Sequence, residues 1–437
     1  MKSRKILPHI ITAVLSVVLL CVAFISTATS TGTTPFTLME KLGIYSSDSG
    51  FAYGIANNSF SANGTHEFFL SLLKKTAVNN TINGFVPIAV LGIAFVAVLV
   101  FVLGSASKTK YAWTTYLCAI LLPLVFCDFT NLVYFKSLFS NPLVLILLIL
   151  ISAMFFRFYK NESVGLTGII LLAVATVAYT CLGTVQALTS IVLGALIIRL
   201  FKLCKNKTCA ISTIVLGTIV IVQSLVFTAT FKSVDYRQSL YNSVFYGVCK
   251  YDSVAEIGLD PKLDDFKEVY YGMMENEDKY DLENTFYNKV SYKTLLKYYI
   301  THPTNTIKLI NNEAKAAFYT VNEYTFTPYS SIKKLYVPSG LSVVLIIAAV
   351  YIIIAMFIGK KYKNLMPVAE FLSGMAIMWV ISLIATTILN GNSDILTNTY
   401  TFNVIFDILL VSAAVGGIRV MLTMRDENKE KFGITHE

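Results

Sequence analysis

Apolar stretches of about 20 residues recur along the whole chain, and each could cross a bilayer core of ~30 Å as one helix. Lipid offers the backbone no hydrogen-bond partner, so spanning segments are helices or closed barrels. The stretches are solidly apolar rather than alternating, which argues against a barrel. Charged residues make up 14% of the chain, against about 25% in soluble domains. The sequence therefore predicts an all-α polytopic membrane protein.

We expect about ten transmembrane helices. They cover residues 6–27, 85–104, 111–131, 142–156, 164–182, 184–202, 209–231, 339–359, 366–389 and 400–423. The fifth and sixth are almost contiguous, which predicts a tight hairpin around Gly183. The first follows the basic stretch MKSRK, so residues 1–27 could also be a cleaved signal peptide. A length of about 22 residues favours an uncleaved anchor over a signal peptide.

Lysine and arginine residues mark alternate ends of the predicted spans. One set of ends carries nearly all of them, and the short loops of the opposite set hold only Lys136. The positive-inside rule then places both termini in the cytoplasm. Richness in Ile, Lys, Asn, Tyr and Phe is typical of an AT-rich bacterial genome, so we expect a multi-pass protein of the bacterial cytoplasmic membrane. The net charge of +9 sits mostly in short loops, which favours membrane lipid over nucleic acid as a partner.

This orientation divides the chain into three parts. Residues 1–231 form a bundle of seven helices with an outer loop, 28–84, that we expect to lie against the membrane. Residues 232–338 form an extracytoplasmic, mainly helical domain. Residues 339–437 add three spans and a short cytoplasmic tail.

Two short helices are expected late in the extracytoplasmic domain. Ser291 is a candidate N-cap of the first. Thr301 is a candidate N-cap of the second, with Pro303 in its first turn.

Asp128 lies at the outward end of the third predicted span, among aromatic residues. A carboxylate in an apolar setting costs a few kcal/mol unless it is paired or hydrated. It is therefore either a hydrated residue at the membrane surface or a metal ligand or general base in an outward-facing cleft. Asp48 and Glu40, in the outer loop, could meet it across the mouth of the bundle. Two such carboxylates could hold a divalent cation, or one could deprotonate an acceptor hydroxyl.

Basic residues follow the seventh span and include Lys232 and Arg237. Such cations can snorkel to lipid headgroups, or they can hold the phosphate of a lipid-linked substrate. His302, one of four histidines, precedes a proline and a predicted helix, which favours a structural role. No phosphate-binding glycine-rich loop with its lysine appears, and the middles of the spans carry almost no charge, which argues against an ATP-driven pump or an ion-coupled transporter.

Three stretches resemble segments of the GT-C superfamily, the polyprenyl-phosphate-sugar-dependent membrane glycosyltransferases, and most closely bacterial hexose transferases of glycan biosynthesis. They are DFTNLVYFKSLFSNP at 128–142, NSVFYGVCKYDSVAEIGLDPKL at 242–263 and YYITHPTNTIKLI at 298–310. The resemblance covers residues 1–340 loosely.

The resemblance implies a catalytic site on the outer face. Asp48 or Glu40 would match the family's acid of the first outer loop, and Asp128 an acid of the second. Arg237 would match the contact to the donor phosphate. The family often has paired acids in the first loop, whereas this chain has single acids there.

The expected function is transfer of a sugar from a polyprenyl-phosphate donor to a cell-surface glycan or lipid-linked acceptor. Asp48, Glu40 and Asp128 are the candidate catalytic acids, with a Mg or Mn ion at Asp128 and Asp48 as an option. A polymerase or ligase of surface polysaccharide, using Arg237 and His302, is one alternative. A non-enzymatic lipid or glycan transporter is the other.

Overall fold

The protein was analysed as a computed structural model. It describes residues 2–26, 44–46, 52–55, 64–106, 112–136, 138–161, 163–230, 236–267, 269, 271, 281–317 and 340–431.

The described chain is an all-α membrane bundle, as predicted. Eight of its helices are long and apolar enough to cross a membrane. They are α1 (Lys2–Ser26), α4 (Phe85–Ala106), α7 (Asn141–Asn161), α9 (Thr184–Arg199), α10 (Lys207–Thr230), α16 (Leu341–Lys361), α17 (Met366–Asn390) and α19 (Tyr400–Lys431). A bent pair makes a ninth if it is one span: α5 (Ala112–Phe126) meets the following α6 (Phe129–Leu132) and η1 (Val133–Lys136) at 56°. The predicted span at 164–182 corresponds to α8 (Leu166–Thr180), an apolar helix of only 15 residues.

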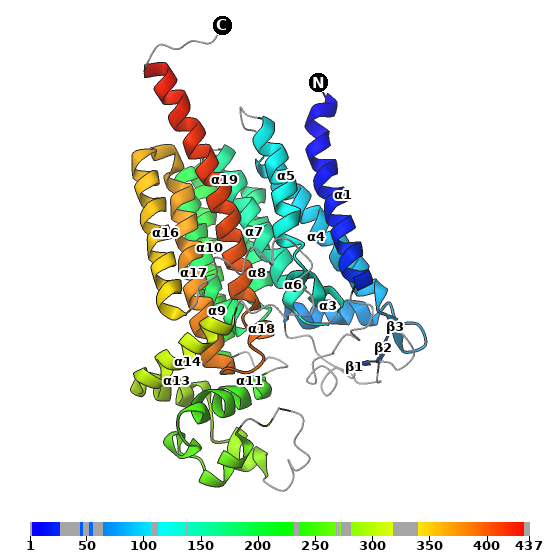
Figure 1. The fold of residues 1–437 in the computed structure, drawn as a ribbon, viewed down its shortest axis with the longest axis vertical. Coiled ribbons are helices and arrows are strands. Elements are labelled where there is room, and N and C mark those ends of the chain that lie inside the picture. The colour runs from blue at the N-terminus through cyan, green and yellow to red at the C-terminus, as the bar shows by residue number, and fades with distance from the viewer. Residues whose placement is uncertain are drawn as a thin grey trace.

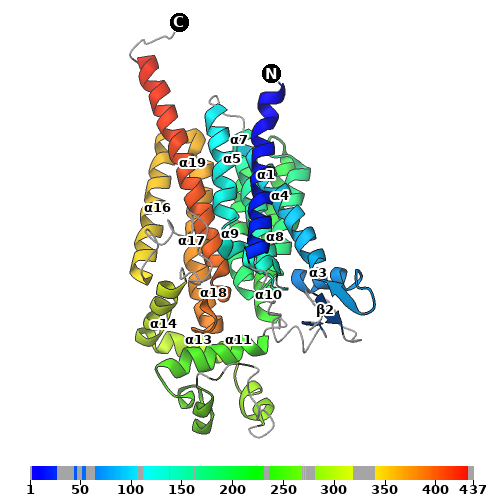
Figure 2. The same ribbon diagram turned by 45° about the vertical axis from the view of Figure 1, so that its right-hand side comes forward.

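The helix α1 begins, and α19 ends, at the same end of the bundle (Figure 1). Four shorter helices gather at the opposite end, which we call the domain end (Figure 2). They are α3 (Thr65–Lys74), α11 (Tyr236–Asn242), α13 (Tyr292–Thr301) and α14 (Pro303–Ala316). This layout agrees with the sequence-based expectation that both termini share one side and the regions 28–84 and 232–338 share the other.

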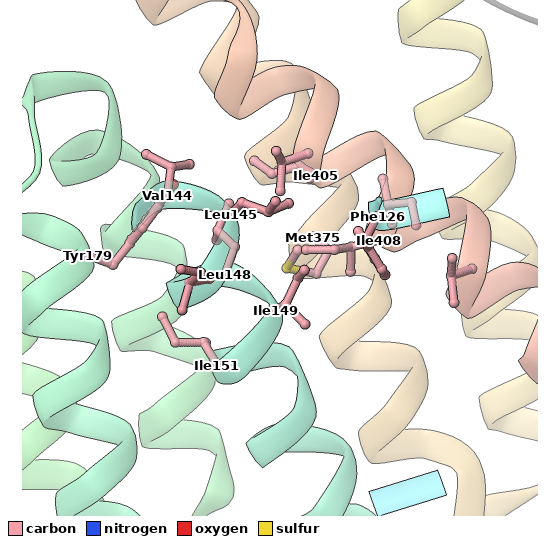
Figure 3. Packing of buried hydrophobic residues seen from close by; sticks show 14 of the residues in the cluster. Phe126, Val144, Leu145, Leu148, Ile149, Ile151, Tyr179, Met375, Ile405 and Ile408 are labelled. Atoms are coloured by element: carbon pink, nitrogen blue, oxygen red, sulfur yellow. The ribbon is translucent and has the colours of Figure 1, made fainter. Parts of the chain in front are cut away.

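The core of the bundle is built around α7 and α17, which are the most enclosed of the described spans. Leu145 of α7 lies near Ile405 of α19, as Figure 3 shows, and both are fully buried. By contrast, α16 exposes Ile353 and Phe357 on its outer surface. Apolar side chains on the perimeter are expected in a protein whose surrounding solvent is lipid.

The helices α9 and α10 approach each other at two glycines. A Cβ atom added to Gly217 would lie 2.8 Å from the carbonyl oxygen of Gly194 and 2.6 Å from Cγ1 of Ile198. A Cβ atom on Gly194 would likewise lie 3.0 Å from the carbonyl oxygen of Gly217. Small residues at a membrane helix crossing let the two backbones pack closely.

The helices at the domain end have their own aromatic core. Tyr241, Phe245 and Phe286 are buried, and the rings of Phe245 and Phe286 stack with centroids 5.3 Å apart. Burial of rings of this size dominates the energetics of a small core. Ser291 caps α13 as predicted, because its hydroxyl accepts a hydrogen bond from the Thr294 amide at 3.4 Å.

The region 28–84 contains a small sheet that the sequence did not predict. The strands β1 (Ile44–Ser46), β2 (Ala52–Ile55) and β3 (Thr81–Asn83) are antiparallel in the order β1-β2-β3, with Tyr53 paired to Ile82. Tyr53 and Ile82 are buried in one cluster with Leu70 of α3. Strands of three or four residues are too short to show an alternating pattern in the sequence, so they are recognised only in the structure, where they pack against α3.

Candidate functional site

Asp128 lies at the break between α5 and α6, where the chain leaves its helical path. The residue has extended backbone angles, and its carbonyl oxygen accepts hydrogen bonds from the amides of Asn131 and Leu132 at 2.9 and 3.1 Å. Its carboxylate Oδ2 accepts a hydrogen bond from the Thr130 hydroxyl at 2.5 Å. The chain therefore leaves α5 just before Asp128 and begins a new helix immediately after it.

Asp128 is fully buried, with 0% of its surface exposed, so its interpretation as a hydrated carboxylate at the membrane surface is wrong. The sequence pattern continued the third span to residue 131, whereas α5 ends at Phe126. A helix of 15 residues is about 22 Å long, shorter than the ~30 Å bilayer core. The helix α5 therefore ends before it has covered that thickness, and Asp128 follows it at a buried break rather than in an exposed loop.

A second carboxylate, Asp407 of α19, lies in the same interior. Tyr400 and Asp407 are seven residues apart, two helical turns, and so share one face of α19. The Tyr400 hydroxyl interacts electrostatically with both Asp128 and Asp407. Asp407 is 1% exposed and Tyr400 is 4% exposed. We call Asp128, Tyr400, Asp407 and the neighbouring Tyr134 the carboxylate site.

Two tyrosines connect this site to the domain end. The ring of Tyr134, in η1, meets the ring of Tyr400 edge to face with centroids 5.0 Å apart. The Tyr134 hydroxyl lies 3.4 Å from the hydroxyl of Thr397, in α18 (Ile395–Asn398). The Tyr400 hydroxyl is buried and has no hydrogen-bond partner among the described residues. It is thus a buried polar atom, within the electrostatic reach of two carboxylates, that could bind a hydroxyl or a water molecule.

Asp407 was not among the predicted site residues, because the middles of the spans were interpreted as almost free of charge. One signal was present, since Asp407 is a lone acid inside an otherwise apolar stretch. Ionisable residues within spans are expensive, so each is a functional hypothesis by itself.

Arg237 is on α11 and contacts other residues of the domain end. Its guanidinium forms an ion pair with Glu283 at 2.7 Å, and both side chains are about half exposed, at 49% and 51%. It also lies over the ring of Tyr287, 5.0 Å from the centroid. None of these described contacts reaches the carboxylate site.

His302 separates α13 from α14. Its Nδ1 lies 3.1 Å from the carbonyl oxygen of Tyr298, and its ring stacks on the ring of that residue at 4.4 Å. The prediction that Thr301 caps the second helix is wrong, because Thr301 is the last residue of α13 and His302 takes the cap position. Pro303 begins α14 and supplies no amide hydrogen, so the chain breaks its helix immediately before the proline.

The remaining predicted site residues, Glu40, Asp48 and Lys232, lie outside the described residues. Within the described ranges, no group of three or more His, Cys, Asp or Glu side chains could hold a metal ion. Mg²⁺ is often held by one or two carboxylates together with substrate phosphates. Asp128 and Asp407 could therefore serve such an ion only together with further oxygen ligands.

Fold and site together define a polytopic α-helical membrane protein with a buried pair of carboxylates between α5 and α19. The family model that describes the YfdI N-terminal transmembrane domain matches residues 3–434. The chain therefore belongs to the YfdI family. No curated protein and no solved structure shows a significant match to it.

Proposed function

We propose that this protein transfers a sugar from a polyprenyl-phosphate donor to a cell-surface glycan or lipid-linked acceptor at the extracytoplasmic side of the bacterial cytoplasmic membrane. The observation that carries the proposal is the burial of Asp128 at the break between α5 and α6, with Tyr400 and Asp407 within electrostatic reach of one another. Membership of the YfdI family supports a membrane-associated, glycan-related function. The resemblance to GT-C enzymes supports sugar transfer from a lipid-linked donor as the reaction. The placement of lysine and arginine at the span ends supports the extracytoplasmic side as its location.

In this proposal Asp128 is the general base. Its carboxylate takes the proton of an acceptor hydroxyl, whose oxygen forms a bond to the anomeric carbon of the donor sugar. The bond between that carbon and the phosphate oxygen breaks, and polyprenyl phosphate leaves with the bonding electrons. No nucleotide-binding fold is needed, because the donor arrives already activated on lipid. Asp48 and Glu40 of the first outer loop remain proposed partners in this step.

The proposed contacts to the donor phosphate come from Arg237, Lys232 and His302. Arg237 is paired with Glu283 at the surface. Exposed ion pairs of this kind contribute only about 0–1 kcal/mol, so a phosphate could replace the glutamate at little cost. If a Mg or Mn ion takes part, Asp128 and Asp48 would hold it, and it would supply positive charge to stabilise the leaving phosphate.

The proposal can be tested with membrane vesicles that contain the full chain, a labelled polyprenyl-phosphate sugar and the cell-surface acceptor fraction. Sugar transfer predicts that label moves from lipid to acceptor and that a deletion strain accumulates unextended acceptor. Accumulation of unflipped lipid intermediate would instead indicate a transporter. Loss of activity through Arg237 and His302, with the acids dispensable, would indicate a polymerase or ligase.

Replacing Arg237 with glutamine should raise the apparent KM for the lipid donor roughly tenfold, because a charge-assisted hydrogen bond contributes about 1.5–3 kcal/mol. The value of kcat should stay close to that of the wild type, since the phosphate is bound before and during transfer. Initial rates at varied donor concentration measure both. Lys262→Gln is a matched control, because Lys262 is an exposed cation of the same domain. An unchanged KM in Arg237→Gln would remove this residue from the donor site.

Replacing Tyr400 with phenylalanine should slow transfer about tenfold or more without lowering the thermal stability of the protein. The hydroxyl has no hydrogen-bond partner among the described residues, so its loss leaves no other group unsatisfied there. Initial transfer rates and thermal unfolding of the purified protein measure the two effects. A Tyr400→Phe protein with wild-type rates would show that this hydroxyl does not contact the reacting groups.

A further inference from the structure

Glu313 is an ionisable residue at the domain end that the proposed reaction does not use. It lies on α14 and is fully buried, with 0% of its surface exposed. Its Oε2 accepts a hydrogen bond from the side-chain amide of Asn392 at 2.6 Å. Its Oε1 is also buried and has no hydrogen-bond partner among the described residues. Only one of the two carboxyl oxygens of Glu313 therefore has a hydrogen-bond partner among the described residues.

Asn392 joins Glu313 to a second element. Its side-chain Oδ1 accepts a hydrogen bond at 3.1 Å from Nζ of Lys250, which lies in η4 (Val248–Lys250). Its backbone N–H donates to the carbonyl oxygen of Tyr246 at 3.2 Å. Asn392 lies in the connection between α17 and α18. One residue of that connection therefore links α14 to the segment that follows α11.

The connection around Asn392 is tightly held. Gly391 has a φ of +57°, and a Cβ atom added there would lie 2.7 Å from the carbonyl oxygen of Asn242 and from the amide nitrogen of Gly247. The same connection continues through Asp394 into α18, whose Thr397 contacts Tyr134 of the carboxylate site.

Two charged groups near Glu313 are Lys250 in η4 and Asp394 at the start of α18. Burial raises the pKa of the Glu313 carboxyl to about 8, while the Asn392 hydrogen bond and Lys250 lower it and Asp394 raises it. Below this pH the buried carboxyl is neutral, and above it the site holds a charge that burial disfavours. Between the ordinary pKa of 4.5 and about 8, the folded chain holds a proton that the unfolded chain has lost. The free energy of unfolding should therefore fall as the pH rises through this window and level off above it.

We propose that Glu313, Asn392 and Lys250 form a proton-sensitive latch that fastens α14 and the α11–η4 segment to the α17–α18 connection. Protonated Glu313 keeps the latch closed. Loss of the proton leaves a negative charge on a buried carboxylate, which burial disfavours, and loosens the contact between the domain end and the bundle. The latch is independent of the proposed sugar transfer, because its consequence is a pH-dependent stability.

Thermal unfolding of the purified full chain in lipid nanodiscs, from pH 5 to pH 10, tests this inference. The wild-type midpoint temperature should fall by about 5 °C as the pH rises to 8. Glu313→Gln, which resembles the protonated group, should lack this component of the pH dependence. Asp265→Asn is the matched control, because Asp265 is an exposed acid of the same domain, and it should retain the wild-type dependence. Identical pH profiles for the wild type and Glu313→Gln would overturn the latch.

Two further variants distinguish titration of Glu313 from a merely structural contact. Lys250→Gln removes a nearby positive charge and should move the transition to higher pH, by about half a pH unit. Asp394→Asn removes a nearby negative charge and should move it to lower pH by a similar amount. Shifts in the same direction, or no shift in either variant, would contradict the assignment of the transition to Glu313.

Discussion

Replacing Asp128 with asparagine is expected to reduce sugar transfer at least ~100-fold, because a general base contributes about 10²–10⁴ to the rate. Asparagine has the size of aspartate, and its carbonyl oxygen can still accept the hydrogen bond that Thr130 donates. It cannot accept the proton of an acceptor hydroxyl. Initial rates with labelled polyprenyl-phosphate sugar and saturating acceptor in membrane vesicles measure the loss.

The stability of the Asp128→Asn protein separates this chemical effect from misfolding. A buried carboxylate is costly in an apolar interior, so a neutral amide there should leave the midpoint of thermal unfolding unchanged or raise it. Asp260→Asn is the matched control, because Asp260 is an exposed acid and asparagine can still cap the Lys262 amide. A stable Asp128→Asn protein with normal transfer rates would remove Asp128 from the role of base.

Replacing Gly217 with valine is expected to cause the largest loss of stability in the bundle, about 3 kcal/mol or more. The new Cβ atom would stand 2.8 Å from the carbonyl oxygen of Gly194, a backbone atom that cannot rotate away. The helices α9 and α10 would have to separate, and their close packing would be lost. Thermal unfolding in nanodiscs should show a midpoint about 5 °C or more below that of the wild type.

Gly416→Val is the matched control for this substitution. Gly416 is also a glycine within a long helix, α19, but a Cβ atom there would meet nothing within 4 Å. We expect its unfolding midpoint to stay within about 1 °C of the wild type, since a substitution that meets no neighbour has little effect. Equal losses in the two variants would show that the Gly194–Gly217 contact does not hold α9 against α10.

The spans were predictable because hydropathy is a local property of the chain. A stretch such as Leu341–Lys361 is long and apolar by itself, and it forms a helix in lipid whatever its neighbours are. The cap at Ser291 was predictable for the same reason, since it depends on residues within one turn.

The candidate site was only partly predictable. The sequence identified Asp128 as an acid in the wrong setting, but it placed that acid at the membrane surface instead of in the buried break between α5 and α6. It grouped Arg237 and His302 with Asp128, whereas their described contacts are to Glu283, Tyr287 and Tyr298 at the domain end. No local sequence pattern predicted the burial of Glu313, because an acid on a short helix outside the spans is normally solvated.

By itself, the sequence determined that this chain is a helical membrane protein, roughly where each span lies, and that the ends of the spans differ in charge. These properties follow from the transfer of each segment, taken alone, from water to lipid. Only the tertiary structure decided that Asp128 and Asp407 are both buried near Tyr400, and that Glu313 is enclosed against Asn392. The burial of a polar group depends on which distant elements pack over it, and no local pattern contains that information.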